Sequence, residues 1–378
     1  MTGLELREAR SRADVEAFIA AARAGQARNS RWIELPAEET RRALDPKRSP
    51  VLRENEVGAF VALRDGVPVG RIAAVVNRAH LAKYHDACGH FGLIEAVDDA
   101  EVFAALLGAA GDFLRARGMR LMRGPFSLTI NHEAGLLVEG FDEPHVVRTN
   151  HAPPHYAARL EALGLVKAMD LYAYVCDVGT TDFPERVARL AARAGVRGVV
   201  TEGLTLTGFA RGFRRVLDLY NDAWADNWGS IPVSDAEAKM IAALTLPVAR
   251  PTWIRLARAG GEDVAVLAQI PDVNEALRGL HGRLWPFGWI RALAGTHLGA
   301  TRLTRVPMIG VARKWRGTRT GALAVSLLLA EALDAARRAG VEGVEISWML
   351  ETNRAVLNLV ESLPARRARV FRVYQSAL

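Results

Sequence analysis

The chain has 378 residues, of which 50% are hydrophobic, with 49 Lys and Arg residues against 42 Asp and Glu residues; this length favours two domains over one. Two cysteines, Cys88 and Cys176, are too few for a disulfide framework, so the sequence predicts a reducing, cytoplasmic location. The N-terminal segment is charged from its fifth residue, unlike a signal peptide, and no apolar run reaches the roughly 18 residues that span a bilayer.

The first predicted elements form a hairpin, a helix and a strand. Residues 57–77 predict two strands joined by a turn at Asp65 and Gly66. A helix is expected over about 100–117, because Gly118 follows it at a position where a left-handed backbone is favoured. A further strand is expected through 120–128.

The second half repeats this order. Residues 251–270 predict a hairpin around two glycines, a helix covers about 320–339 and ends at Gly340, and residues 344–350 form a strand. From the helix-ending glycine to an asparagine beyond the next strand is 13 positions in both halves, Gly118 to Asn131 and Gly340 to Asn353. We infer an internal duplication. It predicts an α/β (α+β) fold with two mixed central sheets flanked by helices, in residues 1–180 and 181–378.

The second half is longer at about residues 273–300. The interval from hairpin glycine to helix-ending glycine exceeds that of the first half by 27 residues, since it runs from 261 to 340 rather than from 66 to 118. This insertion combines aromatic, apolar and basic side chains, namely Trp285, Phe287, Trp289, Ile290, Arg283 and Arg291. Such a mixture suits a membrane interface or an apolar substrate channel. The alternative is a cap whose tryptophans pack into the core.

A turn that could bind phosphate lies between a predicted strand and the helix at 320–339. Glycines allow the backbone to approach a phosphate, and the free N–H groups at a helix start attract anions. The residues expected to hold phosphate are Val311, Arg313, Arg316, Gly317, Thr318, Arg319, Thr320 and Gly321. A purely structural basic loop is the alternative. The first half carries Asp98, Asp99 and Glu101 at the corresponding place, and these carboxylates would repel phosphate.

This turn resembles the donor-binding motif of the GNAT superfamily, Arg/Gln-x-x-Gly-x-Gly/Ala. Arg316, Gly321 and Ala322 are in register with that motif, while Arg319 replaces its middle glycine. More of the chain resembles a bacterial group of two-halved GNAT proteins that includes the bacterial ceramide synthases. The matching segments are GRIAAVVN, GPFSLTINHEAGLLVEGFD, NDAWADNWGSIP, GRLWPFGW and EISWMLETN.

The resemblance implies a tandem GNAT-like fold. The contrast between the basic turn and the acidic helix start of the first half favours a donor site in the C-terminal half and a degenerate N-terminal half that shapes the acceptor side. The resemblance also implies N-acylation of a long-chain sphingoid base by an acyl thioester, either acyl-CoA or an acyl carrier protein, without a tightly bound cofactor. The excess of basic residues agrees with such anionic partners and with an anionic membrane surface on the inner leaflet. A different amine acceptor and a non-catalytic acyl-CoA-binding or lipid-binding module remain alternatives. No nucleic-acid motif is present.

Acyl transfer to an amine needs a base for the ammonium and an acid for the leaving thiolate. Glu351 or Glu345, on the segment that ends the strand at 344–350, is the candidate base. The resemblance implies that Tyr374, after the last helix, is the acid and that Asn353 contacts the pantetheine arm. The alternatives are an exposed glutamate and a tyrosine packed in the core.

Two segments are candidates for binding the acceptor. One holds Asn131, His132 and Glu133 among turn glycines. The other places polar and aromatic side chains at helical spacing as one stripe, namely Tyr220, Asn221, Trp224, Asn227 and Trp228. A core stripe is the alternative. Trp285 and Trp289 of the insertion complete the candidate substrate contacts.

No metal site is expected from the remaining histidines. His80, His85 and His90 are five residues apart, which is wrong for one face of a helix, and we expect no cysteine partner beside them.

Overall fold

The computed structural model describes residues 3–193, 198–248, 250–297 and 301–378. Its internal contacts define two compact units. Unit 1 comprises residues 1–171, 277–286 and 369–378, and unit 2 comprises residues 172–276 and 287–368. Each unit contains most of one expected half. Two segments of the second half belong to unit 1, because residues 277–286 return to it and the end of the last strand, β13 (Ala365–Ala377), pairs there with β5 and β6.

Unit 1 is built on a mixed sheet whose first hairpin matches the prediction. Strands β2 (Glu56–Arg64) and β3 (Val67–Val76) are joined by Asp65 and Gly66, which both have positive φ, at 52° and 79°. This is the backbone that a two-residue hairpin turn requires. The other strands are β1 (Leu4–Glu8), β4 (Cys88–Ala96), β5 (Leu121–Gly124) and β6 (Leu136–Glu139), and the order is β1-β2-β3-β4-β5-β13.

Helices cover both faces of this sheet. Helix α1 (Arg12–Gln26) packs Ala21 against Val61 and Leu63 of β2. Helix α5 (Ala100–Arg115) covers the other face, where Gly58 and Gly70 leave room for its side chains. The remaining helices of unit 1 are α2 (Ala37–Ala43), α3 (Pro50–Glu54), α4 (Arg78–Tyr84) and α6 (His155–Ala162).

Unit 2 repeats the arrangement with its own mixed set of strands. Its strands are β8 (Val199–Gly203), β9 (Ile254–Ala259), β10 (Glu262–Pro271), β11 (Leu303–Val311), β12 (Gly343–Leu350) and the end of β7 (Val166–Asp177). The order is β7-β12-β11-β10-β9-β8. Strands β11 and β12 are parallel, whereas β8, β9, β10 and β11 pair antiparallel in succession. The predicted hairpin at residues 260 and 261 and the predicted mixed sheet are both confirmed.

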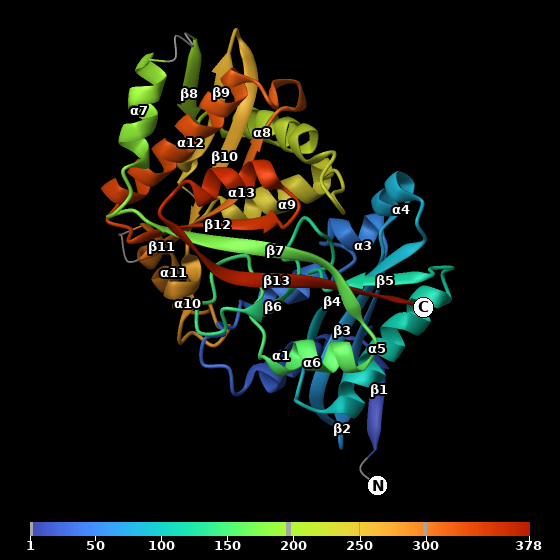
Figure 1. The fold of residues 1–378 in the computed structure, drawn as a ribbon. Coiled ribbons are helices and arrows are strands. Elements are labelled where there is room, and N and C mark those ends of the chain that lie inside the picture. Colours follow the sequence, from blue (N-terminus) through green and yellow to red (C-terminus); the bar gives the residue numbers. More distant parts are fainter. Residues whose placement is uncertain (1–2, 194–197, 249, 298–300) are drawn as a thin grey trace. The chain divides into compact units, whose positions relative to one another are not determined.

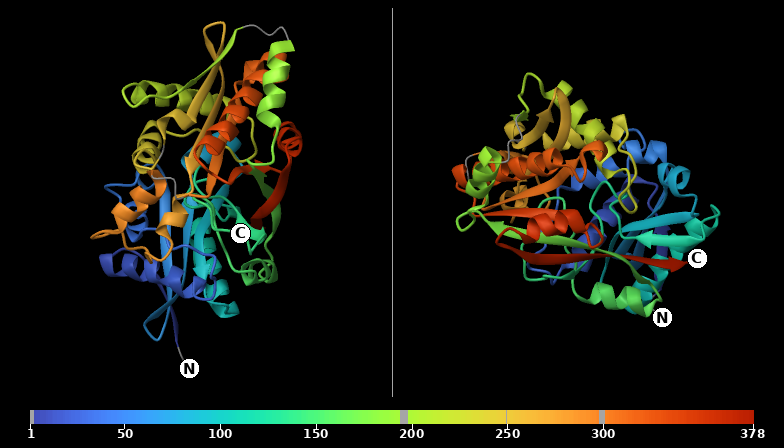
Figure 2. Two further views of the ribbon diagram at one scale, coloured as in Figure 1. Left: turned by 90° about the vertical axis from the view of Figure 1, so that its left-hand side faces the viewer. Right: turned by 45° about the horizontal axis from the view of Figure 1, so that its top comes forward.

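The sheet of unit 2 is also covered on both faces, as the alternation along β10 shows. Ala265 and Leu267 pack with α12 (Arg319–Arg338) and α7 (Phe183–Arg193), whereas Val266 and Ala268 pack beneath α8 (Phe209–Trp224). Helix α12, orange-red, runs beside α7, lime green (Figure 1, Figure 2).

The other helical elements of unit 2 are short. They are α9 (Asp235–Thr245), α10 (Val273–Leu277), α11 (Gly288–His297), α13 (Arg354–Glu361) and the single turns η1 (Pro251–Trp253) and η2 (Arg313–Trp315). Helices α10 and α11 occupy the insertion, of which residues 298–300 lie outside the described residues. Within the described chain, none of the helices is both long enough and apolar enough to cross a membrane.

Candidate active site

The two parallel strands of unit 2 stop pairing part of the way along. The register between β11 and β12 runs from Leu303 opposite Gly343 to Val306 opposite Ile346. Strand β11 continues to Val311 while paired with β10 on its other side, and β12 continues to Leu350. From residue 307 to residue 311, the main-chain N–H and C=O groups on the side of β11 that faces away from β10 are therefore not paired with β12. Such groups can hydrogen-bond to an extended ligand that takes the place of a strand.

Beyond β11 the chain makes the predicted turn into α12. The turn has a left-handed residue at Gly317, with φ of 70°, and it ends at Thr318, whose Oγ1 atom accepts a hydrogen bond from the Gly321 N–H at 3.0 Å. Gly321 lies against the turn itself, since a Cβ atom there would be 2.2 Å from the Trp315 carbonyl oxygen. The expected strand, turn and helix are present, and the first N–H groups of α12 lack helical acceptors, as at any helix start.

The arginines of this turn differ in what holds them. Arg313 donates from its backbone N–H and from Nε to Asp222, at 2.8 and 2.9 Å. Although burial raises the pKa of Asp222, its hydrogen bonds with Arg313 outweigh this and lower that pKa overall. Arg316 lies 3.0 Å from Asp226. Arg319 is exposed at the first position of α12 and forms no ion pair with any residue that the structure describes. It is therefore available for an anionic ligand.

Glu345 lies where the ladder between β11 and β12 ends. It stands opposite Arg305 in the register, with Arg305 Nε 3.8 Å from its Oε1 atom. The Ser347 hydroxyl accepts a hydrogen bond from Arg305 Nε at 2.9 Å and donates to Glu345 Oε1 at 2.5 Å. Glu345 is 0% exposed and Ser347 3% exposed. The carboxylate is thus held rigidly inside unit 2.

Arg305 and Ser347 were not among the residues expected from the sequence. A charged residue within the apolar run of β11 was the available signal, since a buried guanidinium requires a partner. Because side chains alternate along a strand, Glu345 and Ser347 lie on the same face of β12. Both faces of this strand are covered, so these polar residues are buried and bond to each other.

The other residues expected in the chemistry lie in different places. Glu351 follows β12 in a turn and is half-buried, and Asn353 caps α13, where its side chain accepts from the Val356 N–H at 3.4 Å. Tyr374 belongs to unit 1. It is buried on β13 opposite Gly124, and its hydroxyl donates to Glu161 at 2.9 Å. Burial first, and then the contact with this carboxylate, raise the pKa of Tyr374 above its ordinary value.

The expected stripe of five polar and aromatic residues is wrong in part, because α8 ends at Trp224. Asn227 and Trp228 lie in the turn that follows the helix. Trp224 stacks on Tyr220 with ring centroids 4.6 Å apart and packs on β11, where a Cβ atom at Gly310 would be 2.3 Å from the indole. Trp224 therefore covers the part of β11 that has left the ladder.

In unit 1 the corresponding place is closed. Pairing between β4 and β5 runs from Cys88 to His90, and the Phe126 N–H then donates to the Phe91 carbonyl at 2.9 Å. The two backbones touch, since a Cβ atom at Gly92 would lie 1.4 Å from the Phe126 carbonyl oxygen. As expected, Asp99 caps α5, accepting from the Glu101 N–H at 2.9 Å. Among the described residues of unit 1, this place therefore has no free strand edge, and α5 begins with acidic instead of basic residues.

The candidate acceptor residues of unit 1 lie in the loop after this crossing. The His132 Nδ1 atom is 2.8 Å from the Ser127 carbonyl oxygen, and Glu133 is buried 3.3 Å from Arg148. Asn131 donates its backbone N–H to Thr129 Oγ1 at 3.3 Å. The loop is therefore fixed by its own polar contacts.

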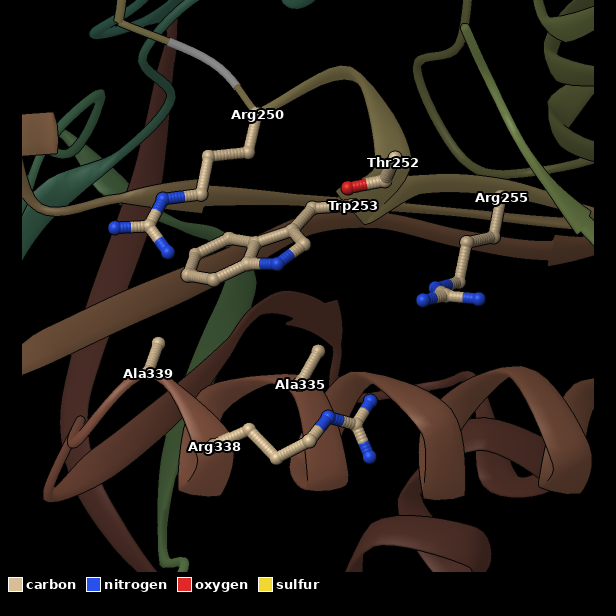
Figure 3. Close-up of a pocket in the computed structure, with 7 residues that line it drawn as sticks. All are labelled: Arg250, Thr252, Trp253, Arg255, Ala335, Arg338 and Ala339. Atoms are coloured by element: carbon tan, nitrogen blue, oxygen red, sulfur yellow. The ribbon is translucent and has the colours of Figure 1, made fainter.

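A basic pocket lies at the opposite end of α12 from the turn. It is lined by Arg250, Thr252, Trp253, Arg255, Ala335, Arg338 and Ala339 (Figure 3). Ala335 is 16 positions after Arg319 on the helix, which corresponds to about 24 Å. The pocket is therefore separate from the turn that begins α12.

The aromatic residues of the insertion are exposed. Trp285 is 82% exposed and Phe287 73%, while Trp289 and Ile290 are about half exposed, at 44% and 48%. The alternative of a cap that buries its tryptophans is therefore wrong for these side chains.

One expectation about the histidines is also wrong. Cys88 lies beside His80 and His90, because Cys88 and His90 are alternate residues of β4 and α4 brings His80 next to them.

Comparison with known proteins identifies relatives of this chain by sequence and by structure. No protein-family model matches the sequence. The chain is 36% identical over 367 residues to a bacterial ceramide synthase of Caulobacter vibrioides, covering 97% of this chain and 95% of that protein. It is also 36% identical over 322 residues to protein YghO of Escherichia coli, covering 85% and 82%. Among solved structures, it resembles a tandem GNAT protein from the clavulanic acid biosynthesis pathway. That likeness has a TM-score of 0.58 at 14% identity and covers 99% of this chain and 98% of the other.

The structural likeness confirms the expected tandem GNAT fold, and the sequence identity confirms the expected relationship. The chain belongs to the family of the bacterial ceramide synthase.

Proposed function

We propose that this protein transfers a fatty acyl group from acyl-CoA to the amine of a long-chain sphingoid base and so forms a ceramide-type amide. The observation that carries the proposal is the strand edge of β11 beyond Val306, which leads directly into the basic turn before α12. The relationship to the bacterial ceramide synthase supports the choice of acceptor.

Unit 2 has the features that a CoA thioester requires. The free edge of β11 at residues 307–311 offers main-chain groups to the amides of the pantetheine arm. The first N–H groups of α12 and the Arg319 guanidinium then bind the pyrophosphate. We assign Asn353 to the pantetheine arm as well. An acyl carrier protein presents the same arm with a single phosphate in place of the pyrophosphate, so a helix start that acts together with Arg319 favours CoA as the donor.

Of the two candidate bases, we propose Glu351. It is half-buried at the end of β12, whereas Glu345 is fully buried and bound to Ser347 and Arg305. Glu345 then acts as a positioning residue that fixes the end of the ladder. A Glu351→Gln variant loses activity that high pH does not restore, while Glu345→Gln also lowers the thermal midpoint.

For the acid we retain Tyr374. A tyrosine hydroxyl with its ordinary pKa of 10 is already protonated at neutral pH, as a proton donor to a thiolate must be, so the assignment depends on the place of Tyr374 after the last helix and not on its raised pKa. A Tyr374→Phe variant is expected to lower kcat by about 10²–10⁴ with little change in KM. If the folded variant turns over at the wild-type rate, Tyr374 has a purely structural role.

For the acceptor we propose that unit 1 shapes the binding side, with contacts from Asn131, His132 and Glu133. Trp224, Asn227 and Trp228 contribute from unit 2. The amine of a sphingoid base lies at the headgroup level of a bilayer, so the enzyme must reach a membrane surface. The exposed aromatics at 285–290 and the exposed Arg283 and Arg291 beside them suit that surface.

The test is thiol release from a long-chain acyl-CoA with and without a sphingoid base. We expect release that depends on the base, and much slower release when the same acyl group is presented on an acyl carrier protein. Release that depends instead on a polyamine or an aminoacyl amine would show that the protein is an acyltransferase with a different acceptor. Binding of acyl-CoA without release under any of these conditions would indicate a non-catalytic module.

A further inference from the structure

Two histidines and a cysteine form a buried cluster in unit 1. One ring nitrogen each of His80 and His90 and the Sγ atom of Cys88 all lie within 4.8 Å of one another. His80 belongs to α4, whereas Cys88 and His90 share one face of β4 because they are alternate residues of a strand. Three donors of the types that bind zinc therefore converge from two elements.

Both histidines have a ring nitrogen that the protein leaves unused. The Nδ1 atoms of His80 and His90 are buried and accept or donate no hydrogen bond within the described part of the chain. Their side chains are almost wholly buried, since His80 is 1% exposed and His90 is 3% exposed. An unsatisfied buried polar atom costs about 1–3 kcal/mol. Two such atoms in one cluster with a thiol indicate a missing ligand.

Asp86 provides the support that a metal-binding histidine normally has. Its Oδ1 atom lies 3.1 Å from His80 Nε2 and accepts the Cys88 backbone N–H, also at 3.1 Å. A carboxylate on the far nitrogen of a histidine fixes the tautomer and directs the other nitrogen toward the metal. Asp86 therefore orients His80 and also holds the start of β4.

The charges and distances of the cluster are compatible with a divalent ion. A bound Zn²⁺ displaces the proton of the Cys88 thiol, whose pKa burial raises to about 12, and the resulting thiolate and the Asp86 carboxylate together balance two positive charges. In a tetrahedral zinc site the donor atoms are about 3.3–3.6 Å apart. Binding therefore draws the three donors together by roughly 1 Å.

We propose that His80, Cys88 and His90 bind one zinc ion, which joins α4 to β4 and stabilises unit 1. The cluster is buried and supplies three protein ligands, so a water or another small ligand completes the tetrahedral coordination. The proposal does not depend on the acyl transfer proposed above.

The test is a Co²⁺ titration of the full chain after chelation and reduction. We expect one equivalent to bind with a thiolate-to-cobalt charge-transfer band in the near ultraviolet, which Zn²⁺ then abolishes. Cys88→Ser removes the band and His90→Ala weakens binding by at least tenfold. Two matched variants keep both properties, namely Cys176→Ser, the other buried cysteine, and His85→Asn, the exposed histidine of the same segment.

The wild-type spectrum is decisive even where a variant does not fold. Absence of a charge-transfer band at one equivalent of Co²⁺ would overturn the proposal. A band that persists in Cys88→Ser, or that disappears in Cys176→Ser, would overturn it too. A zinc-dependent rise in the thermal midpoint of the wild type, absent in Cys88→Ser, would support it.

Discussion

At the scale of single residues, the basic turn of unit 2 separates arginines that look equivalent in the sequence. Arg313 and Arg316 are held by Asp222 and Asp226, so part of their charge is already neutralised. Arg319 is exposed at the first position of α12. The pattern of basic residues and glycines predicted the turn, but not which arginine is open to a ligand, because the two aspartates come from around the end of α8.

The first prediction concerns this open arginine. Arg319→Ala is expected to weaken acyl-CoA binding by about 1.5–3 kcal/mol, since it removes a charge-assisted contact to phosphate. Calorimetric titration with a non-hydrolysable acyl-CoA analogue measures the change. Arg115→Ala, at the end of α5 in unit 1, serves as the control and leaves the affinity unchanged. Equal affinity in Arg319→Ala and the wild type would remove the turn from the donor site.

The second prediction concerns acid sensitivity and His145. Its Nδ1 atom accepts the Ile33 backbone N–H at 3.0 Å, and its Nε2 atom donates to the Thr149 carbonyl at 2.9 Å. Protonation of Nδ1 would break the first bond. Burial, with a smaller contribution from His151, lowers the pKa of His145 from 6.5 to about 3.

The unfolded chain therefore binds a proton at this residue between pH 6.5 and about 3, whereas the folded chain does not. Stability from His145 is complete above pH 6.5 and is lost as the pH falls through this window. His145→Asn keeps a donor and an acceptor but does not titrate. Its urea midpoint should fall less than that of the wild type between pH 7 and pH 5. Identical pH profiles would show that His145 does not contribute.

At the scale of elements, the start of α12 depends on close packing against its own turn. Gly321→Ala places a methyl group 2.2 Å from the Trp315 carbonyl oxygen, so the turn must shift. We expect weaker acyl-CoA binding by at least tenfold and a lower thermal midpoint. Gly108→Ala is the matched helical control, because a Cβ atom there meets nothing within 4 Å. It should leave binding unchanged and raise stability by about 0.5–1 kcal/mol. Normal binding in Gly321→Ala would show that the turn geometry is irrelevant to the donor.

Elements with local signals were predictable from the sequence. Both hairpins, α5 and α12 begin and end close to the expected residues, because glycines, caps and basic last turns mark them. It was not predictable that the end of β13 belongs to unit 1, because this depends on its pairing with β5 and β6, which lie far away in the sequence. The contact that closes the corresponding place between β4 and β5 was not predicted either, because it too joins residues that are far apart in the sequence. Only the structure shows that Phe126 reaches Phe91.

The candidate site was predicted in part. Repetition along the chain located the turn, and the contrast with Asp99 in the first half favoured the second half for the proposed phosphate site. Burial of Glu345 was not expected, because alternation along one strand does not reveal that both faces are covered. Cys88 was overlooked beside His90 although the two residues are only two positions apart on one strand.

At the scale of the whole molecule, the net charge of +7 and the exposed segment at 285–290 lead to a prediction about membranes. The protein is expected to co-sediment with anionic vesicles, less with neutral ones, and less again at high salt, since the attraction is screened. Trp285→Ala combined with Trp289→Ala should abolish this binding and the activity on a membrane-embedded amine, while activity on a short soluble amine persists.

The control for this variant is Leu190→Ala combined with Leu206→Ala, which removes two other exposed apolar side chains. It should bind vesicles like the wild type. Equal loss of activity on the embedded and the soluble amine would mean that the tryptophans serve the fold instead.

The amide between the acyl group of acyl-CoA and the amine of a sphingoid base can be detected directly. The direct measurement is mass spectrometry of the products after incubation with isotopically labelled acyl-CoA and a long-chain base in vesicles. We expect a labelled amide, whose mass is that of the base plus the acyl group less one hydrogen, and one equivalent of free CoA, both strongly reduced in Arg319→Ala. Free labelled fatty acid without the amide would contradict this function, whereas amide formed equally well by Arg319→Ala would contradict only the assignment of the donor site.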